Sequence, residues 1–185
     1  MRRIINSTYV TLDGIISNPQ DWPALDDPDG EGTGVQQELI DQCDAILLGK
    51  ETYLSFAGVW RGQSGDPFTD RINAIPKHVV STTLTQASWE NSTIIGDDVP
   101  GAVAALKEEP GQDILTYGFG RLARMLMDHG LLDEIRLWIH PFFLGPGPGS
   151  VFLHDQAPAA RLLLRDSRAM ANGTVIHSYG VEPRA

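Results

Sequence analysis

The stretch from Ile114 to Gly130 constrains the fold most, because it has the pattern of a strand, a glycine turn and a helix. A short apolar run ends at Gly118 and Gly120, and apolar residues then recur at helical spacing. Gly130 stands where helices commonly end in a left-handed glycine. Glycines in such a turn let a ligand approach the backbone, and the first N–H groups of a helix attract anions. The stretch therefore favours either a phosphate-binding turn or an ordinary strand-to-helix connection.

The remaining chain continues this strand-to-helix alternation and then changes to strands alone. Apolar, β-branched runs predict earlier strands at residues 4–10, 44–49, 76–82 and 92–95. Helix signals predict helices at residues 34–43, 50–56, 67–74 and 100–108. After a strand at 133–140, residues 161–166 and 174–179 are expected to form an antiparallel hairpin. The pattern predicts a three-layer α/β fold, with a mixed, mostly parallel sheet flanked by helices, in a single domain over residues 1–185.

Three segments without clear periodicity are expected to be loops, at residues 17–34, 60–66 and 141–150. Long loops inside compact domains are usually functional or mobile, so we expect these loops to supply the substrate contacts. Trp22 and Trp60 fall in two of them. Either tryptophan is a candidate to stack on a planar substrate, and either is equally compatible with a subsidiary core.

Charge and cysteine content exclude several classes of function. The 185 residues carry a net charge of −10, which argues against general binding of nucleic acid or anionic membranes. The one cysteine, Cys43, lies in an apolar segment and is expected to be a buried structural thiol. No group of His, Cys or acidic residues has the spacing of a metal site, so no metal is expected. The sequence lacks a signal-peptide core and an apolar run of transmembrane length, so a cytoplasmic protein is expected.

Glycines and hydroxyl residues follow three of the predicted strands. Gly49 and Lys50 follow the second strand, Ser81 and Thr82 follow the third, and the glycine turn at Gly118 follows the fifth. If these strands are parallel, the three ends open on the same edge of the sheet, where ligands of such sheets bind. The set suits an extended polyphosphate ligand such as a dinucleotide. The usual dinucleotide fingerprint after the first strand is absent.

Several motifs together resemble one known family. They are TLDGI at 11–15, LLGKETY at 47–53, KHVVSTTL at 77–84, YGFGRL at 117–122, and GLLDEIRLWIHP at 130–141 followed by LGPG at 144–147. In this order and at these spacings they resemble the dihydrofolate reductase-like family. The closer resemblance is to its branch related to the C-terminal reductase domain of bacterial riboflavin-biosynthesis proteins, and it covers nearly the whole chain.

The resemblance implies an NADPH-dependent reductase that transfers hydride to a small conjugated or heterocyclic substrate, such as a pterin, flavin or pyrimidine, and that forms a homodimer. Its activity would be like 5-amino-6-(5-phosphoribosylamino)uracil reductase or dihydrofolate reductase. Carried over by position, Gly49, Lys50 and Thr52 would hold the adenosine-side phosphates, with Lys50 favouring NADPH over NADH. Ser81 and Thr82 would lie against the adenosine ribose or its phosphate. The pyrophosphate turn would consist of Gly118, Phe119, Gly120, Arg121 and Leu122.

Two departures from the family pattern bear on the reaction. Dihydrofolate reductases place a carboxylate on the first helix, and Glu38 does not align with that position. The cysteine-rich motif of the zinc deaminase half of the riboflavin proteins is missing. Asp13 is the best acidic candidate for catalysis, although an Asp-Gly turn residue explains it equally well. His140 is a weaker candidate for the site than for a structural histidine.

Two other classes of function remain open. The scaffold is also compatible with a protein that binds a nucleotide or flavin-like ligand without turnover, because the sequence has no clear catalytic acid. Loss of cofactor binding is a third option, since the bulky Phe119 lies between the two glycines of the turn.

Overall fold

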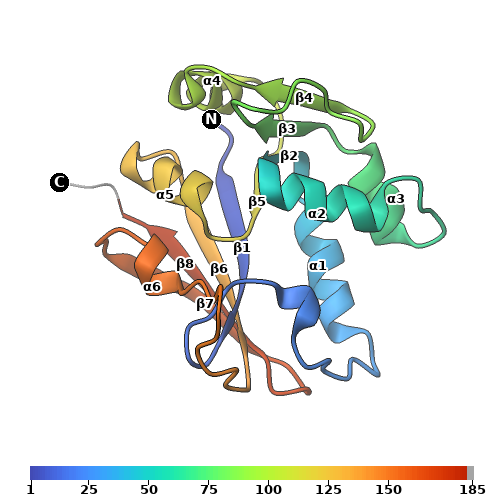
Figure 1. Ribbon diagram of the computed structural model, residues 1–185, viewed down its shortest axis with the longest axis vertical. Coiled ribbons are helices and arrows are strands. Elements are labelled where there is room, and N and C mark those ends of the chain that lie inside the picture. The colour runs from blue at the N-terminus through green and yellow to red at the C-terminus, as the bar shows by residue number, and fades with distance from the viewer. Residues whose placement is uncertain (183–185) are drawn as a thin grey trace.

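The fold is built on an eight-stranded sheet, seen in a computed structural model that describes residues 1–182 (Figure 1). Its strand order is β4-β3-β2-β5-β1-β6-β8-β7. The first six strands in this order pair in parallel, β8 is antiparallel to β6, and β7 is antiparallel to β8. The strands are β1 (Ile4–Thr11), β2 (Cys43–Gly49), β3 (Lys77–Val80), β4 (Ser92–Ile95), β5 (Asp113–Tyr117), β6 (Glu134–His140), β7 (Leu162–Ala169) and β8 (Val175–Val181).

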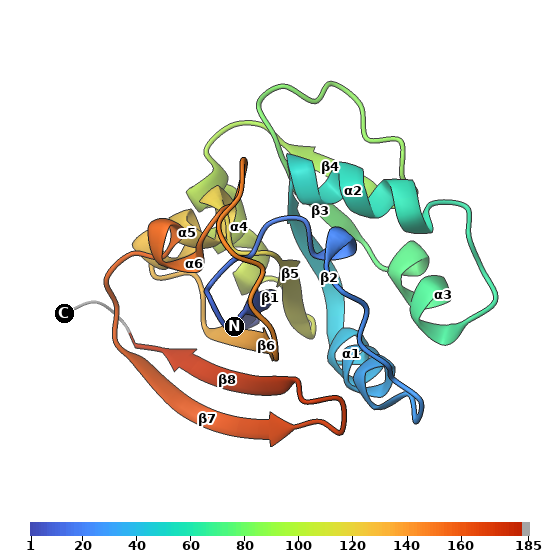
Figure 2. The ribbon, with the colours of Figure 1, turned by 60° about the horizontal axis from the view of Figure 1, so that its bottom comes forward.

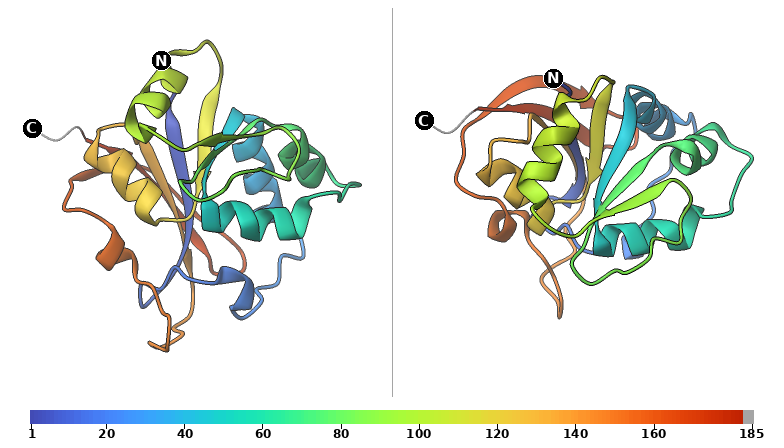
Figure 3. Two further views of the ribbon diagram at one scale, coloured as in Figure 1. Left: turned by 45° about the horizontal axis from the view of Figure 1, so that its top comes forward. Right: turned by 90° about the horizontal axis from the view of Figure 1, so that it is seen from above.

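Helices cover both faces of the sheet, which gives the expected three layers (Figure 3). Along β2, Ala45 and Leu47 belong to one buried cluster, while Ile46 and Leu48 belong to the other. The first cluster packs against α4 and α5, and the second against α1, α2 and α3. The helices are α1 (Glu31–Asp41), α2 (Lys50–Trp60), α3 (Pro67–Ala74), α4 (Val99–Glu108), α5 (Arg121–Asp128), α6 (Leu153–Gln156) and the 3-10 turn η1 (Pro19–Asp21).

The predicted α/β class and the C-terminal hairpin are confirmed (Figure 2). Some boundaries are wrong. The first helix begins at Glu31 instead of Gly34, because the Asp27 carboxylate accepts hydrogen bonds from the N–H groups of Gly32 and Thr33, at 3.1 Å each. A side chain that satisfies these N–H groups stabilises the start of a helix. Two short elements were not predicted. The 3-10 turn η1 lies inside the predicted 17–34 loop, and α6 follows residue 150.

Trp60 was predicted to lie in a loop, but it is the last residue of α2. Its ring packs against Phe56, with ring centroids 4.5 Å apart, and against Phe68 at 5.8 Å. These aromatic contacts belong to the second buried cluster and extend the helix beyond Phe56, where it was predicted to end.

Cys43 is fully buried at the start of β2, as predicted. Burial raises the pKa of its thiol to about 12, so the thiol is unreactive at neutral pH. Within residues 1–182 no group of three His, Cys, Asp or Glu side chains is arranged to hold a metal ion. No helix in the same part of the chain is long and apolar enough to cross a membrane.

Candidate functional site

Two helices begin at neighbouring strand ends, and no side chain in the described part of the chain caps their first N–H groups. Helix α2 begins after β2 at Gly49, and α5 begins after β5 at Gly120, and neither glycine can supply a capping oxygen. By contrast, α3 and α4 are capped by Asp66 and Asp98, whose carboxylates accept from backbone N–H groups at 3.0 and 3.3 Å. Uncapped helix N-termini bind anions well, because N–H groups and the helix dipole act together.

The starts of α2 and α5 lie close together. A Cβ atom on Gly49 would lie 3.9 Å from Cβ of Leu122, and one on Gly118 would lie 3.7 Å from Oγ1 of Thr52. Gly118 has a φ of 74°, which favours glycine. Its N–H donates to the Ser7 carbonyl at 3.0 Å, so the turn is fixed to the central strand β1. The sequence-predicted residues of the second and fifth strand ends therefore lie together.

Phe119 does not cover this turn. Its side chain is 3% exposed and belongs to the first buried cluster, under α5. Space beside Gly120 is open, because a Cβ atom there would meet nothing within 4 Å. The bulk of Phe119, which suggested loss of cofactor binding, is turned into the core.

The end of β3 adds a cation and hydroxyl groups to the same edge, since β3 pairs with β2. Lys50 Nζ donates to Thr83 Oγ1 at 2.7 Å. Ser81 Oγ accepts from the N–H groups of Thr83 and Leu84, at 3.2 and 2.9 Å, which shapes the turn after the strand. Ser81 is buried while Thr82 is exposed. Thr83 was not singled out from the sequence, although it lies inside the KHVVSTTL motif.

A second set of side chains gathers where β1 and β6 continue past the end of β5. Strand β5 ends at Tyr117, opposite Ser7, whereas β1 runs on beside β6 until Thr11 pairs with His140. In this region the Tyr9 ring lies 4.9 Å from the His140 ring and 5.5 Å from the Trp138 ring. Gln36, from α1, donates its Nε2 to the Tyr9 hydroxyl at 2.9 Å. We call Tyr9, Gln36, Trp138 and His140 the polar–aromatic cluster.

The polar–aromatic cluster is uncharged at neutral pH. Burial raises the pKa of the Tyr9 phenol and lowers the pKa of the His140 imidazole. Both pKa shifts favour the neutral forms of these side chains at neutral pH. Gln36 and Tyr9 were not proposed from the sequence, because nothing in the sequence shows which face of α1 packs beside the end of β1.

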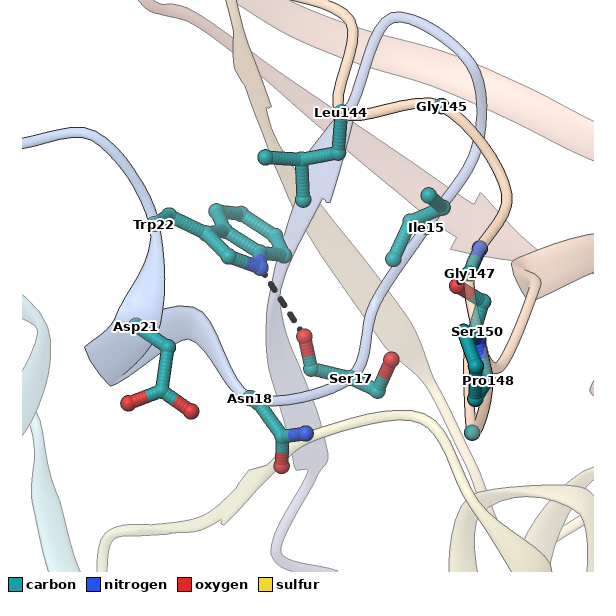
Figure 4. Close-up of a pocket in the computed structure, with 11 residues that line it drawn as sticks. Ile15, Ser17, Asn18, Asp21, Trp22, Leu144, Gly145, Gly147, Pro148 and Ser150 are labelled. Atoms are coloured by element: carbon teal, nitrogen blue, oxygen red, sulfur yellow. Dashed lines mark hydrogen bonds between the residues drawn. The ribbon is translucent and has the colours of Figure 1, made fainter.

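Trp22 connects this cluster to a pocket of about 200 Å³ (Figure 4). Its ring meets His140 edge-on at 5.3 Å, and its Nε1 donates to the Ser17 carbonyl at 2.9 Å. The pocket lies between the segments 15–22 and 144–150, and apart from Ile15 its lining residues fall in the 17–34 and 141–150 loops that were predicted to supply substrate contacts. Trp22 lines it, whereas Trp60 is not among its lining residues. The two tryptophans that were proposed to contact the substrate are therefore not brought together.

Glu38 lies away from this cluster. Its side chain is 69% exposed and lies 3.8 Å from a terminal nitrogen of Arg168 on β7. The polar side chain that α1 contributes to the cluster is the amide of Gln36 and not a carboxylate.

Comparison with known proteins places the chain in a family. The model of the RibD C-terminal domain matches residues 2–176, which is most of the chain. The chain belongs to the RibD C-terminal domain family. The uncharacterized protein YyaP of Bacillus subtilis is 34% identical over 183 residues, a match that covers 94% of this chain and 92% of that protein.

Solved structures similar to this member of the RibD C-terminal domain family share its fold. A putative riboflavin biosynthesis protein from Shewanella sp. PV-4 superposes with a TM-score of 0.76 at 18% identity, over 97% of this chain and 99% of that one. A diaminohydroxyphosphoribosylaminopyrimidine deaminase/5-amino-6-(5-phosphoribosylamino)uracil reductase from Thermotoga maritima superposes with a TM-score of 0.66 at 14% identity. That match covers 98% of this chain and 57% of the Thermotoga chain.

Asp13 links the end of β1 to the 144–150 segment of this RibD-type domain. Its carboxylate accepts from the Thr11 hydroxyl and from the N–H groups of Gly145, at 2.8 Å, and Leu144, at 3.5 Å. The Thr11 hydrogen bond, supported by Gly145, lowers the pKa of Asp13. The carboxylate therefore stays ionised at neutral pH, which suits a residue that positions the loop better than a proton donor.

Acidification is expected to release the 144–150 segment from Asp13. Because the pKa of Asp13 is lowered in the folded protein, its contribution is complete above the ordinary aspartate range, near pH 4, and is lost as the pH falls through the lowered value. Hydrogen exchange of the Gly145 N–H should therefore accelerate in Asp13→Asn at pH 7, relative to wild type. Equal protection in the two proteins would show that the carboxylate does not hold the loop.

Proposed function

We propose that this protein is an NADPH-dependent reductase that transfers hydride to a small conjugated or heterocyclic substrate. The observation that carries the proposal is the pair of adjacent, uncapped helix starts at Gly49 and Gly120, with Lys50 beside them. Such a pair suits a dinucleotide, whose phosphates need several N–H donors along one edge. Membership of the RibD C-terminal domain family supports a reductase of a pyrimidine-like substrate.

In this proposal different residues of the sheet edge bind different parts of the dinucleotide. The turn from Gly118 to Leu122 and the start of α5 would hold the pyrophosphate. Gly49, Lys50 and Thr52, with Ser81 and Thr82, would hold the adenosine ribose and its phosphate. NADPH supplies the hydride when it is bound. The chain's own task is to fix the ring of the cofactor against the substrate and to exclude water.

Lys50 is proposed to select NADPH over NADH by meeting the 2′-phosphate. Lys50→Ala is expected to weaken NADPH binding by about tenfold or more, because a charged hydrogen bond contributes about 1.5–3 kcal/mol. NADH binding should change little. Calorimetric titration of both cofactors into wild type and variant measures the difference.

Arg121→Ala is the matched control for this titration. Arg121 is exposed at the first turn of α5, where it would meet the pyrophosphate that both cofactors share. Its loss should weaken both cofactors equally. If Lys50→Ala also weakens the binding of NADPH and NADH equally, Lys50 does not bind the 2′-phosphate. If wild type binds neither cofactor, the reductase proposal fails, and if it binds NADPH that no acceptor oxidises, ligand binding without turnover becomes the function.

We also propose that the protein is a homodimer, with the edge strand β7 at the interface. Nearly all of β7 is exposed, including Leu163 at 43% and Leu164 at 51%. An edge strand that shows apolar side chains and free backbone groups is suited to pairing with another chain. The pairing of two identical edges would form a symmetric contact.

A further inference from the structure

The polar–aromatic cluster contains buried hydrogen-bonding atoms that have no partner within residues 1–182. They are the Trp138 Nε1, the Gln36 Oε1 and the His140 Nε2. Trp138 as a whole is only 3% exposed, so its donor has been removed from water without compensation. Buried polar atoms without partners are rare and costly in folded proteins. The three atoms offer a donor, an acceptor and a group that can be either, next to aromatic rings.

The segments around this cluster lack the two residue types that are always cationic at neutral pH. Residues 4–49 and 137–160 include no lysine or arginine. The segment that runs from the end of β1 to the start of α1 is instead rich in acids, namely Asp13, Asp21, Asp26, Asp27, Asp29 and Glu31. A phosphate or carboxylate held here would lack a cationic partner and would be repelled by these acids.

Two arginines on neighbouring strands of this side of the sheet, Arg136 and Arg168, are already paired. Arg136 shares the face of β6 with Trp138, and its Nε donates to Glu134 Oε1 at 2.6 Å. Arg168 on β7 lies 3.2 Å from Glu31. Lys50, by contrast, stands at the cofactor edge beside β3. The proposed cofactor edge and the polar–aromatic cluster therefore differ in charge. The cofactor edge carries the cation Lys50, whereas neutral or acidic groups surround the cluster.

We infer that the substrate of this enzyme is an uncharged, planar heterocycle with N–H donors and carbonyl acceptors, and that it carries no phosphate. The inference rests on the proposed reductase function and deepens it. It also separates this chain from the Thermotoga protein, whose name specifies a phosphoribosyl substrate.

Gln36 is the residue that we assign to recognising the heterocyclic ring of the substrate by a hydrogen bond. Its Nε2 is occupied by the Tyr9 hydroxyl at 2.9 Å, which leaves its Oε1 to accept from a ligand N–H. An amide at this place accepts a hydrogen bond from a neutral ring, whereas a carboxylate would favour a protonated one. Glu38, the nearby carboxylate of α1, is exposed and faces Arg168.

The test compares one ring with and without its phosphate. 5-Amino-6-ribitylaminouracil and its 5′-phosphate are titrated into the protein, with and without saturating NADPH, and binding is followed by tryptophan fluorescence and calorimetry. The unphosphorylated compound is expected to bind at least tenfold more tightly than the phosphate. Gln36→Leu should weaken the unphosphorylated compound by about tenfold, the effect of one lost hydrogen bond that leaves a partner unpaired.

Gln37→Leu is the matched control, because Gln37 is the next residue of α1 and its amide bonds only to Asp41 on the exposed side. It should leave binding of both compounds unchanged. Equal or tighter binding of the phosphate would overturn the inference, as would the absence of binding by both compounds in a protein that binds NADPH. Failure to bind NADPH would instead count against the reductase proposal, and the titrations without cofactor still decide whether the ring binds.

Discussion

Gly120→Asp is expected to weaken NADPH binding by about a hundredfold while leaving the protein at least as stable as wild type. Gly120 is the N-cap of α5, its φ of −119° suits any residue, and a Cβ atom there would meet nothing within 4 Å. An aspartate would cap the helix as Asp66 and Asp98 cap α3 and α4. Its charge would occupy the place proposed for the pyrophosphate, and repulsion of about 3 kcal/mol between charges near 4 Å corresponds to a hundredfold.

Gly120→Asn separates the charge from the shape of the new side chain. Asparagine caps a helix about as well as aspartate but carries no charge, so its effect on NADPH binding should be much smaller. Thermal unfolding and calorimetric titration of the three proteins give stability and binding together. Unchanged NADPH binding in Gly120→Asp would place the pyrophosphate elsewhere.

Lys77→Met is expected to lower the free energy of unfolding by about 3 kcal/mol, because it leaves buried carbonyl groups without a donor. Lys77 is fully buried, and its ammonium group donates to the carbonyls of Asn73, Ile75 and Glu90 at 2.9, 2.9 and 3.1 Å. It also lies 4.5 Å from the centre of the Trp89 ring. Burial lowers the pKa of Lys77 to about 8, so the group is still largely protonated at pH 7.

Urea unfolding at pH 7 measures this loss, with Arg61→Met as the control. Arg61 is an exposed cation that donates to Ser88 Oγ at 2.7 Å, in the same loop that Lys77 holds. Exposed polar contacts contribute little, so the control should change stability by less than about 0.5 kcal/mol. A loss below about 1 kcal/mol in Lys77→Met would mean that the three carbonyls find other partners.

Much of the fold followed from local sequence patterns. The strand that ends at Gly49, the helix from Pro67 to Ala74 and the glycine at 130 after α5 all lie where the patterns predicted them. Their signals are local: apolar runs, a proline at a helix start, and a glycine with positive φ at its end. The grouping of the strand ends also followed, because β3, β2 and β5 are adjacent and parallel.

The other parts of the site depend on contacts between distant residues, which local patterns do not report. Asp27 starts α1 earlier than expected through a side-chain contact, and Trp60 extends α2 through packing on Phe56 and Phe68. Gln36 contacts Tyr9 only because the folded chain brings α1 and the end of β1 together. Asp13 reads as a turn residue in the sequence, yet its carboxylate also accepts from the backbone of Gly145, far along the chain.

Cys43 gives this protein a practical advantage for measurements of motion. It is the only cysteine in the sequence, it is fully buried, and its thiol pKa is about 12. Maleimide dyes react with exposed thiolates, so the folded protein should remain unlabelled without any cysteine being removed. A cysteine introduced at Phe143, which is 72% exposed beside the pocket, would then carry the dye alone. Its fluorescence would report how the 144–150 segment moves as ligands enter and leave.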